Sequence, residues 1–108
     1  MTIQILYYEF LGPVKLSEWG PPMDEVVYTI MARHKDTFKI IYVDQSEKTK
    51  ELDYFTKNDK FECWLDNAGS ENKLYLSIYL MADSEEIERK KIVDKAIEKY
   101  KPICNMED

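Results

Sequence analysis

Two tyrosines, Tyr28 and Tyr42, are the residues whose type and placement best fit a chemical role. They occupy equivalent places in two neighbouring β-rich segments, although ordinary cross-strand packing explains such a pair equally well. The single histidine, His34, would have to serve any Cys–His or Ser–His dyad, but its position in a polar turn favours a solvated side chain. Cys63 has only Lys60 as a basic neighbour at helical spacing, which argues against a reactive thiol.

Both tyrosines belong to a predicted β-hairpin. The segments Val26–Ala32 and Phe38–Val43 are rich in Val, Ile, Tyr, Phe and Thr, which pack well on a pleated sheet. The polar residues 33–37 connect them, and so short a connection makes the second strand fold back antiparallel. This hairpin is therefore the element that would position the two phenols.

Composition bounds the class of protein. The chain has 108 residues, which fits one domain, and its hydrophobic fraction of 44% supports a buried core. The formal charge of −6 opposes nucleic-acid binding unless a local basic patch exists. No apolar run reaches the roughly 18–20 residues of a membrane span, and the N-terminus lacks the features of a secretion signal.

The two cysteines, Cys63 and Cys104, predict no disulfide framework. A reducing cytoplasm is therefore the expected compartment, and the pair would form a bond only if the fold brought the two residues together.

The segments around the hairpin complete an α+β pattern. Thr2–Phe10 alternates and then becomes aromatic, which predicts one strand at a sheet edge, ended by Gly12-Pro13. Trp19 lies in the Gly/Pro-rich loop that follows, where it would either plug the core or bind a partner. Thr56 is the predicted N-cap of a helix with one apolar stripe, which ends at Gly69.

The C-terminal third predicts one strand and one helix. Lys73–Met81 carries apolar residues on both faces and is expected inside the sheet. Asp83–Lys101 predicts a helix that begins with a capping box of Asp83 and Glu86 and stops at Pro102. The expected fold is α+β, a mainly antiparallel sheet with two main helices packed on it, in the order β-ββ-α-β-α.

Three segments carry a likeness to known motifs: Val26-Val27-Tyr28 with Thr29-Ile30, Ile41-Tyr42-Val43-Asp44 with Gln45-Ser46, and the C-terminal stretch from Ala96 to Pro102-Ile103-Cys104-Asn105. In this order they resemble the GIY-YIG endonuclease superfamily. The resemblance implies one domain over residues 1–108, in which residues 1–24 extend a GIY-YIG-like core at residues 25–105.

In that family the tyrosines help activate the attacking water, an arginine on the first helix holds the scissile phosphate, and a glutamate on the last helix binds a divalent metal. The resemblance thus implies catalytic positions at Tyr28 and Tyr42, and Mg²⁺ or Mn²⁺ as the cofactor of an active enzyme.

The other motif positions depart from the family. Val26 and Asp44 replace the two motif glycines, and residues 45–69 contain no arginine, so that only a lysine such as Lys50 is left to hold the phosphate. The place of the metal glutamate falls near Val93. The adjacent carboxylate, Asp94, is turned by about 100° on a helix.

Three functions follow from these observations. The first is a non-catalytic binding or accessory module with a GIY-YIG-like fold, because the tyrosines are kept while the arginine and the glutamate are missing. The second is an active, atypical nuclease that uses Lys48 or Lys50 and Asp94 instead. The third is an unrelated α+β protein-interaction domain with exposed aromatics around Tyr7, Tyr8 and Trp19. The sequence does not identify a ligand or partner.

Overall fold

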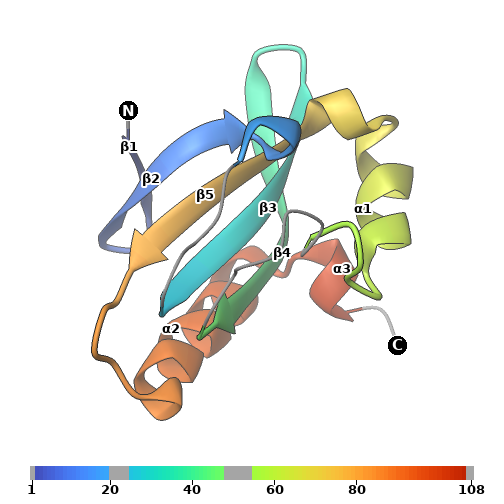
Figure 1. Cartoon of the computed structure of the whole chain (residues 1–108). Coiled ribbons are helices and arrows are strands. Elements are labelled where there is room, and N and C mark those ends of the chain that lie inside the picture. Colours follow the sequence, from blue (N-terminus) through green and yellow to red (C-terminus); the bar gives the residue numbers. More distant parts are fainter. Residues whose placement is uncertain (1, 20–24, 48–54, 107–108) are drawn as a thin grey trace.

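Five antiparallel strands form one curved sheet in the order β1-β2-β5-β3-β4 (Figure 1). The structure, a computed structural model, describes residues 2–19, 25–47 and 55–106. The strands are β1 (Thr2–Ile5), β2 (Tyr8–Lys15), β3 (Val26–His34), β4 (Thr37–Ser46) and β5 (Leu74–Leu80). The helices are α1 (Phe61–Ala68), α2 (Glu86–Tyr100) and α3 (Ile103–Met106), with short 3-10 turns η1 (Leu16–Glu18) and η2 (Glu71–Lys73). The predicted α+β fold class is confirmed.

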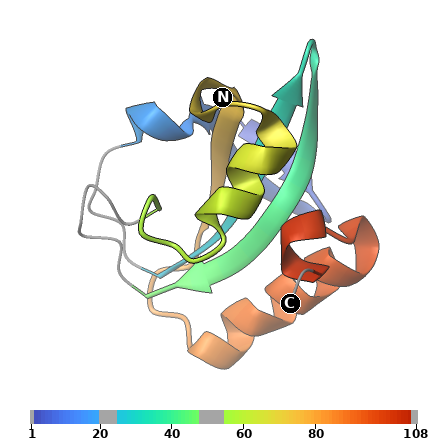
Figure 2. The same ribbon diagram turned by 90° about the vertical axis from the view of Figure 1, so that its right-hand side faces the viewer.

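Helices α1 and α2 cover opposite faces of the sheet, and α3 lies beside strand β4 (Figure 2). Two apolar clusters result because side chains of a strand alternate between faces. Val26, Tyr28 and Ile30 of β3 pack with Trp64 of α1, whereas Val27 packs with helix α2. Strand β3 is therefore buried on both faces from Val26 to Ala32.

The hairpin of β3 and β4 is confirmed, but it is longer than its apolar segments. Strand pairing continues to His34 and Thr37, which leaves only Lys35 and Asp36 in the turn. The polar residues at the tip remain in the strands because both of their faces meet solvent there, and a strand needs apolar side chains only where a face is covered. Strand β5 lies between β2 and β3, as its two apolar faces predicted.

The N-terminal segment forms two strands, so the prediction of one strand over Thr2–Phe10 is wrong. The chain reverses at Leu6 and Tyr7 without a glycine, since Leu6 itself adopts a φ of 58°. Gly12-Pro13 does not end a strand but lies inside β2, where the register shifts. A Cβ on Gly12, which has a φ of 108°, would lie 2.7 Å from the Leu76 carbonyl oxygen.

Both main helices begin later than predicted. Residues 55–60 form turns in which Asn58 accepts a hydrogen bond from the Lys60 N–H, so α1 starts at Phe61 and Thr56 is not its N-cap. Asp83 has a φ of 64° and cannot start α2; the capping box is formed by Glu85 and Glu88 instead. None of the helices in the described ranges has the length and apolar character needed to span a membrane.

A buried arginine fastens the start of α2 to the end of β4. Arg89 is 1% exposed and donates hydrogen bonds from Nε to Gln45 Oε1 at 2.9 Å and from Nη1 to the Ser84 carbonyl at 2.7 Å and hydroxyl at 2.9 Å. Its Nη2 lies 3.5 Å from the exposed Glu47 carboxylate. These acceptors replace the hydrogen bonds to water that the guanidinium loses when it is buried.

We predict that Arg89→Met lowers the free energy of unfolding by about 1.5–3 kcal/mol, since methionine fills the volume but leaves the Gln45 and Ser84 acceptors without their charged donor. Urea unfolding followed by tryptophan fluorescence measures this. Lys90→Met is the control: Lys90 is 63% exposed and pairs with Glu86 on the surface, so its loss is expected to stay within about 0.5 kcal/mol. Equal losses would contradict the anchoring role.

Candidate functional site

The structure brings Tyr28 and Tyr42 together through an irregularity in the hairpin. Ile30 pairs with Tyr42 while Met31 pairs with Ile40, so the register advances by one residue at Ile41. Directly paired residues point to the same face. Because of this shift, Tyr42 faces the same side as Ile30 and Tyr28, and the two tyrosine rings lie 6.3 Å apart.

That shared side is the interior under α1. Tyr28 is 1% exposed and Tyr42 is 8% exposed. Phe55 packs edge-on against Tyr28 with centroids 5.1 Å apart, and Trp64 of α1 packs against Tyr42 at 5.3 Å. The two phenol rings are therefore part of a hydrophobic core of aromatic side chains in tilted and edge-on contact.

The Tyr42 phenol is held in its protonated form. Its Oη donates a hydrogen bond to Asp44 Oδ2 at 2.9 Å, and Asp44 Oδ1 accepts another from the Gln45 N–H. Burial raises the pKa of Tyr42 well above its ordinary value, and the negative charge of Asp44 and its hydrogen bond raise it further. A phenol that keeps its proton so firmly is a poor base for activating water at neutral pH.

The other residues of the predicted site do not join the tyrosines. Asp94 is exposed on α2, the helix that covers the opposite face of the sheet. Its neighbour Val93, where the family resemblance places the metal glutamate, is 7% exposed and packs with Val27 and Val43. Lys48 and Lys50 lie outside the described residues. Within the described residues, no group of three His, Cys, Asp or Glu side chains is arranged to hold a metal ion.

The C-terminal segment is fastened at two points that the sequence left open. Cys63 of α1 and Cys104 of α3 form a disulfide, with Cα atoms 5.9 Å apart, so the fold does bring together the two residues whose pairing the sequence could not decide. The two cysteines are 41 residues apart, so no local sequence pattern indicates their contact. It forms because the chain turns at Lys101 and Pro102 and returns beside β4. The Asn105 side chain then accepts from the Val43 N–H at 2.8 Å and donates to the Val43 carbonyl at 2.9 Å.

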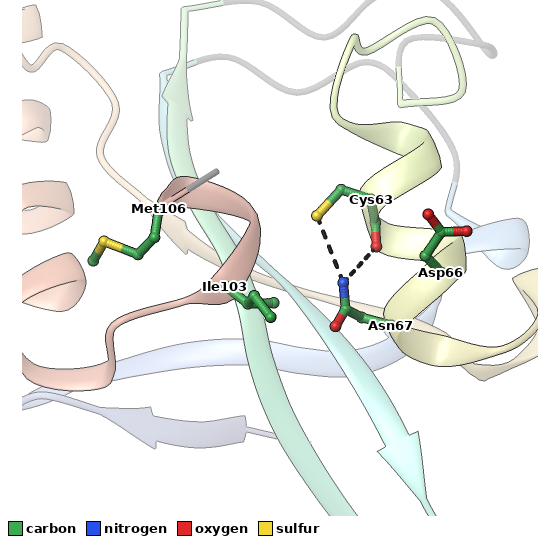
Figure 3. Close-up of a pocket in the computed structure, with 5 residues that line it drawn as sticks. All are labelled: Cys63, Asp66, Asn67, Ile103 and Met106. Carbon is green, nitrogen blue, oxygen red and sulfur yellow. Dashed lines mark hydrogen bonds between the residues drawn. The ribbon is translucent and has the colours of Figure 1, made fainter. Parts of the chain in front are cut away.

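A cavity of about 310 Å³ lies between α1 and α3, next to the disulfide (Figure 3). Asn67 points its amide at Cys63 from within α1, and Asp66 also lines the cavity, although its carboxylate points away from Cys63 in this view. Ile103 and Met106 of α3 form the other wall and are 44% and 51% exposed. The described lining of the cavity thus includes a charged residue, an amide and apolar side chains beside the disulfide.

The tip of the β3–β4 hairpin is a second polar feature, which we call the hairpin tip (Arg33–Phe38 with the ring of Tyr75). The Arg33 guanidinium carbon lies 5.8 Å from the Phe38 ring centroid and 5.9 Å from that of Tyr75. Arg33 also donates from Nε to the Lys35 carbonyl at 2.8 Å and from Nη1 to the Tyr75 hydroxyl at 3.2 Å. These bonds use two of the five donors of the guanidinium, and the Arg33 side chain is exposed.

Further cations lie at the same end of the sheet as the hairpin tip, although Lys39 points to the face opposite Phe38 and Tyr75. Lys15 pairs with Tyr75 in the register, Lys39 pairs with Ala32, and Lys73 immediately precedes β5. Among the residues that the structure describes, none of these lysines, nor Arg33 or Lys35, forms an ion pair with a carboxylate. This site was not predicted from the sequence because its residues come from separate parts of the chain: Lys15, residues 33–39, and Lys73 with Tyr75.

The aromatic surface expected of a protein-interaction domain is reduced to one residue. Tyr7 is 90% exposed at the turn between β1 and β2. Tyr8 instead packs against Tyr79, with ring centroids 4.9 Å apart, and Trp19 packs edge-on against Phe55 at 5.0 Å. Trp19 therefore covers the core, which agrees with its interpretation as a plug.

Comparisons with protein-family models, with curated proteins and with solved structures found no match to this chain.

We predict that the free energy of unfolding of Tyr42→Phe falls less at alkaline pH than that of the wild type. The unfolded phenol ionises near pH 10, whereas the folded one stays protonated because its pKa is raised. The stability that Tyr42 contributes is therefore fully present below about pH 10 and is lost above it, by up to about 1.4 kcal/mol per pH unit. Urea unfolding at about pH 8 and pH 11 should show a smaller decline for Tyr42→Phe than for the wild type.

The exposed Tyr7 provides the control. Tyr7→Phe is expected to keep the wild-type decline with pH, since that side chain is 90% exposed. A decline in Tyr42→Phe as steep as in the wild type would contradict the raised pKa.

Proposed function

We propose that this protein is a non-catalytic binding module with a GIY-YIG-like fold, and that its ligand binds at the hairpin tip. The main support for the loss of catalysis is that the tyrosine positions and the metal-binding position of the motif lie far apart in the fold. Tyr28 and Tyr42 are buried under α1, while Val93 and Asp94 belong to the helix on the other face of the sheet. Metal-assisted phosphodiester hydrolysis requires the water, the phosphate and the metal to be in contact.

Two physical facts support the loss of catalysis. The tyrosine rings pack in a cluster with Phe55 and Trp64, which are 2% and 0% exposed, and the Tyr42 hydroxyl is already bonded to Asp44. A valine at the metal position has no ligand atom and is itself packed against the sheet. In this proposal the two tyrosines of the hairpin have a structural role, because their buried rings stabilise the fold.

A cytoplasmic setting is part of this proposal. Because that compartment keeps most protein thiols reduced, the Cys63–Cys104 bond would face a reducing environment there.

We predict that the purified protein does not nick supercoiled plasmid with Mg²⁺ or Mn²⁺ above the rate of a buffer blank. Tyr42→Phe and Asp94→Asn should give the same background, because neither group takes part in a reaction. The measurement is conversion of supercoiled to open-circular DNA on an agarose gel. Metal-dependent nicking that disappears in Tyr42→Phe or Asp94→Asn would overturn the proposal and favour the atypical nuclease.

The hairpin tip favours single-stranded nucleic acid as the ligand. Arg33 is held in place by the Phe38 and Tyr75 rings and by the Lys35 carbonyl, so its free donors are already oriented for a phosphate. Phe38 is 37% exposed and offers a ring on which a base can stack. Lys15, which shares the face of Tyr75, and Lys35 in the turn form no ion pair with a carboxylate of the described residues, and they supply positive potential in a chain whose net charge is −6.

We predict that a fluorescent oligothymidylate binds the protein at low salt with an affinity that falls as salt rises, since the contacts release counterions. Phe38→Leu should weaken binding by about fivefold or more through lost stacking. Arg33→Gln should weaken it and flatten the salt dependence, because one phosphate contact is removed. Fluorescence anisotropy titrations measure both effects.

Lys95→Gln, an exposed lysine on α2, is the matched charge control and should bind like the wild type. Thermal unfolding of Arg33→Gln checks that the hairpin is intact. Equal binding by Arg33→Gln and the wild type would refute the hairpin tip as the site. Preference for a polyglutamate peptide over the oligonucleotide would assign the tip to an acidic protein partner instead.

A further inference from the structure

We propose that the Cys63–Cys104 disulfide is a site of thiol–disulfide exchange, attacked at Cys63 by a small thiol that enters the cavity between α1 and α3, and that its reduction releases α3 from the edge of the sheet. This inference stands independently of the ligand at the hairpin tip. Three observations carry it: the two cysteine residues differ in exposure, a cavity is lined by one of them, and the bond holds a segment that covers an edge strand.

The two cysteines are not equivalent. Cys104 is 0% exposed and lies in the apolar cluster under α1, whereas Cys63 is half-buried and lines the cavity (Figure 3). Exchange requires direct contact between the attacking sulfur and one sulfur of the bond. Access therefore selects Cys63 as the sulfur that is attacked and Cys104 as the one that leaves.

The cavity has the size and lining for such a reagent. Its volume of about 310 Å³ exceeds what a thiol of a few heavy atoms requires, and Ile103 and Met106 provide an apolar wall. Asn67 Nδ2 donates to the Cys63 carbonyl at 2.8 Å and lies 3.6 Å from Cys63 Sγ and 3.8 Å from Cys104 Sγ. An N–H donor near both sulfurs favours negative charge on the one that leaves.

The chemistry balances with a dithiol as the reductant. Its thiolate forms a bond to Cys63 Sγ, and the electron pair of the old S–S bond departs with Cys104, which then takes up a proton. The second thiol of the reductant attacks the mixed disulfide, freeing Cys63 as a thiol and closing the disulfide of the reductant. The protein gains two electrons and two protons, and the dithiol loses the same.

The charge of Asp66 sets a preference among thiols. Among the described residues that line the cavity, Asp66 is the charged one. A carboxylate there repels an anionic thiol and attracts a cationic one, with an effect that salt reduces. Small cationic thiols are therefore the preferred chemical class, and anionic thiols of the same size are disfavoured.

Reduction of the disulfide is expected to affect strand β4, because α3 covers the edge of the sheet that this strand forms. Strand β4 is the last strand of the sheet order, and its Val43 N–H and carbonyl bond to Asn105 rather than to another strand. Asn105 directly follows Cys104, so the disulfide restrains the residue that closes this edge. Without the bond, α3 keeps the Asn105 contacts but opens more often, which exposes strand-pairing groups at Val43.

The site of attack is tested on the intact oxidised protein. A limiting amount of cysteamine is added, free thiols are alkylated after an acid quench, and peptides are mapped by mass spectrometry. We expect cysteamine on Cys63 and the alkyl group on Cys104, in excess over the reverse by on the order of tenfold. Equal labelling, cysteamine mainly on Cys104, or no adduct until urea unfolds the protein would overturn the proposal.

The route of entry is tested by charge. The rate with cysteamine is divided by the rate with 2-mercaptoethanesulfonate, for the wild type and for Asp66→Asn. The intrinsic reactivities of the two thiols cancel in this comparison, and the ratio should fall by about threefold or more in Asp66→Asn. An unchanged ratio would contradict entry through the cavity.

The consequence is tested by amide hydrogen exchange before and after reduction. Exchange at Val43 should accelerate by a larger factor than exchange at Val27, which lies in the middle of the sheet. Cys63→Ser and Cys104→Ser remove the same bond from either side and should both reproduce the effect without reductant. Equal acceleration at Val43 and Val27 would show a global loss of stability and refute the release of α3.

Discussion

The one-residue register shift at Ile41 is the constraint on which the rest of this structure depends. The turn at Lys35 and Asp36 alone would pair Tyr42 with Thr29 and direct it toward α2. The shift pairs Tyr42 with Ile30 instead and directs it toward α1, beside Tyr28. Since Ile41 and Tyr42 both join the cluster under α1, the shift also supplies the area on which that helix packs.

Burial of β3 on both faces then decides which side chains remain available for chemistry. Tyr28 on one face and Thr29 on the other are both below 2% exposed, and the Thr29 hydroxyl is satisfied by a hydrogen bond to Ser77 of β5. Polar groups in this region are thus paired inside the sheet rather than presented to a substrate. The same is true of Arg89, whose charge serves the junction between α2 and β4.

Binding or reaction with other molecules is therefore expected at the periphery of the sheet, where side chains are accessible to solvent. At one end, the strands of the hairpin extend beyond the covered region and carry Arg33 between two aromatic rings. At the β4 edge, Asn105 and the disulfide of Cys104 hold the C-terminal segment in place of a sixth strand. An uncovered edge strand invites pairing with other chains, and a helix tied across it prevents this.

The sequence by itself determined the fold class, the hairpin, the interior position of β5 and the long helix that stops before Pro102, because alternation, helical spacing and helix-stop residues are local patterns. It did not determine the N-terminal reversal at Leu6, the start of α1 after Asn58 or the capping box at Glu85, where single residues adopt turns that their types do not require. Only the tertiary structure decided that Tyr28 and Tyr42 share a buried side, that Asp94 lies on the other face, and that Cys63 meets Cys104. Each of these depends on register and on how distant segments pack, which no local pattern records.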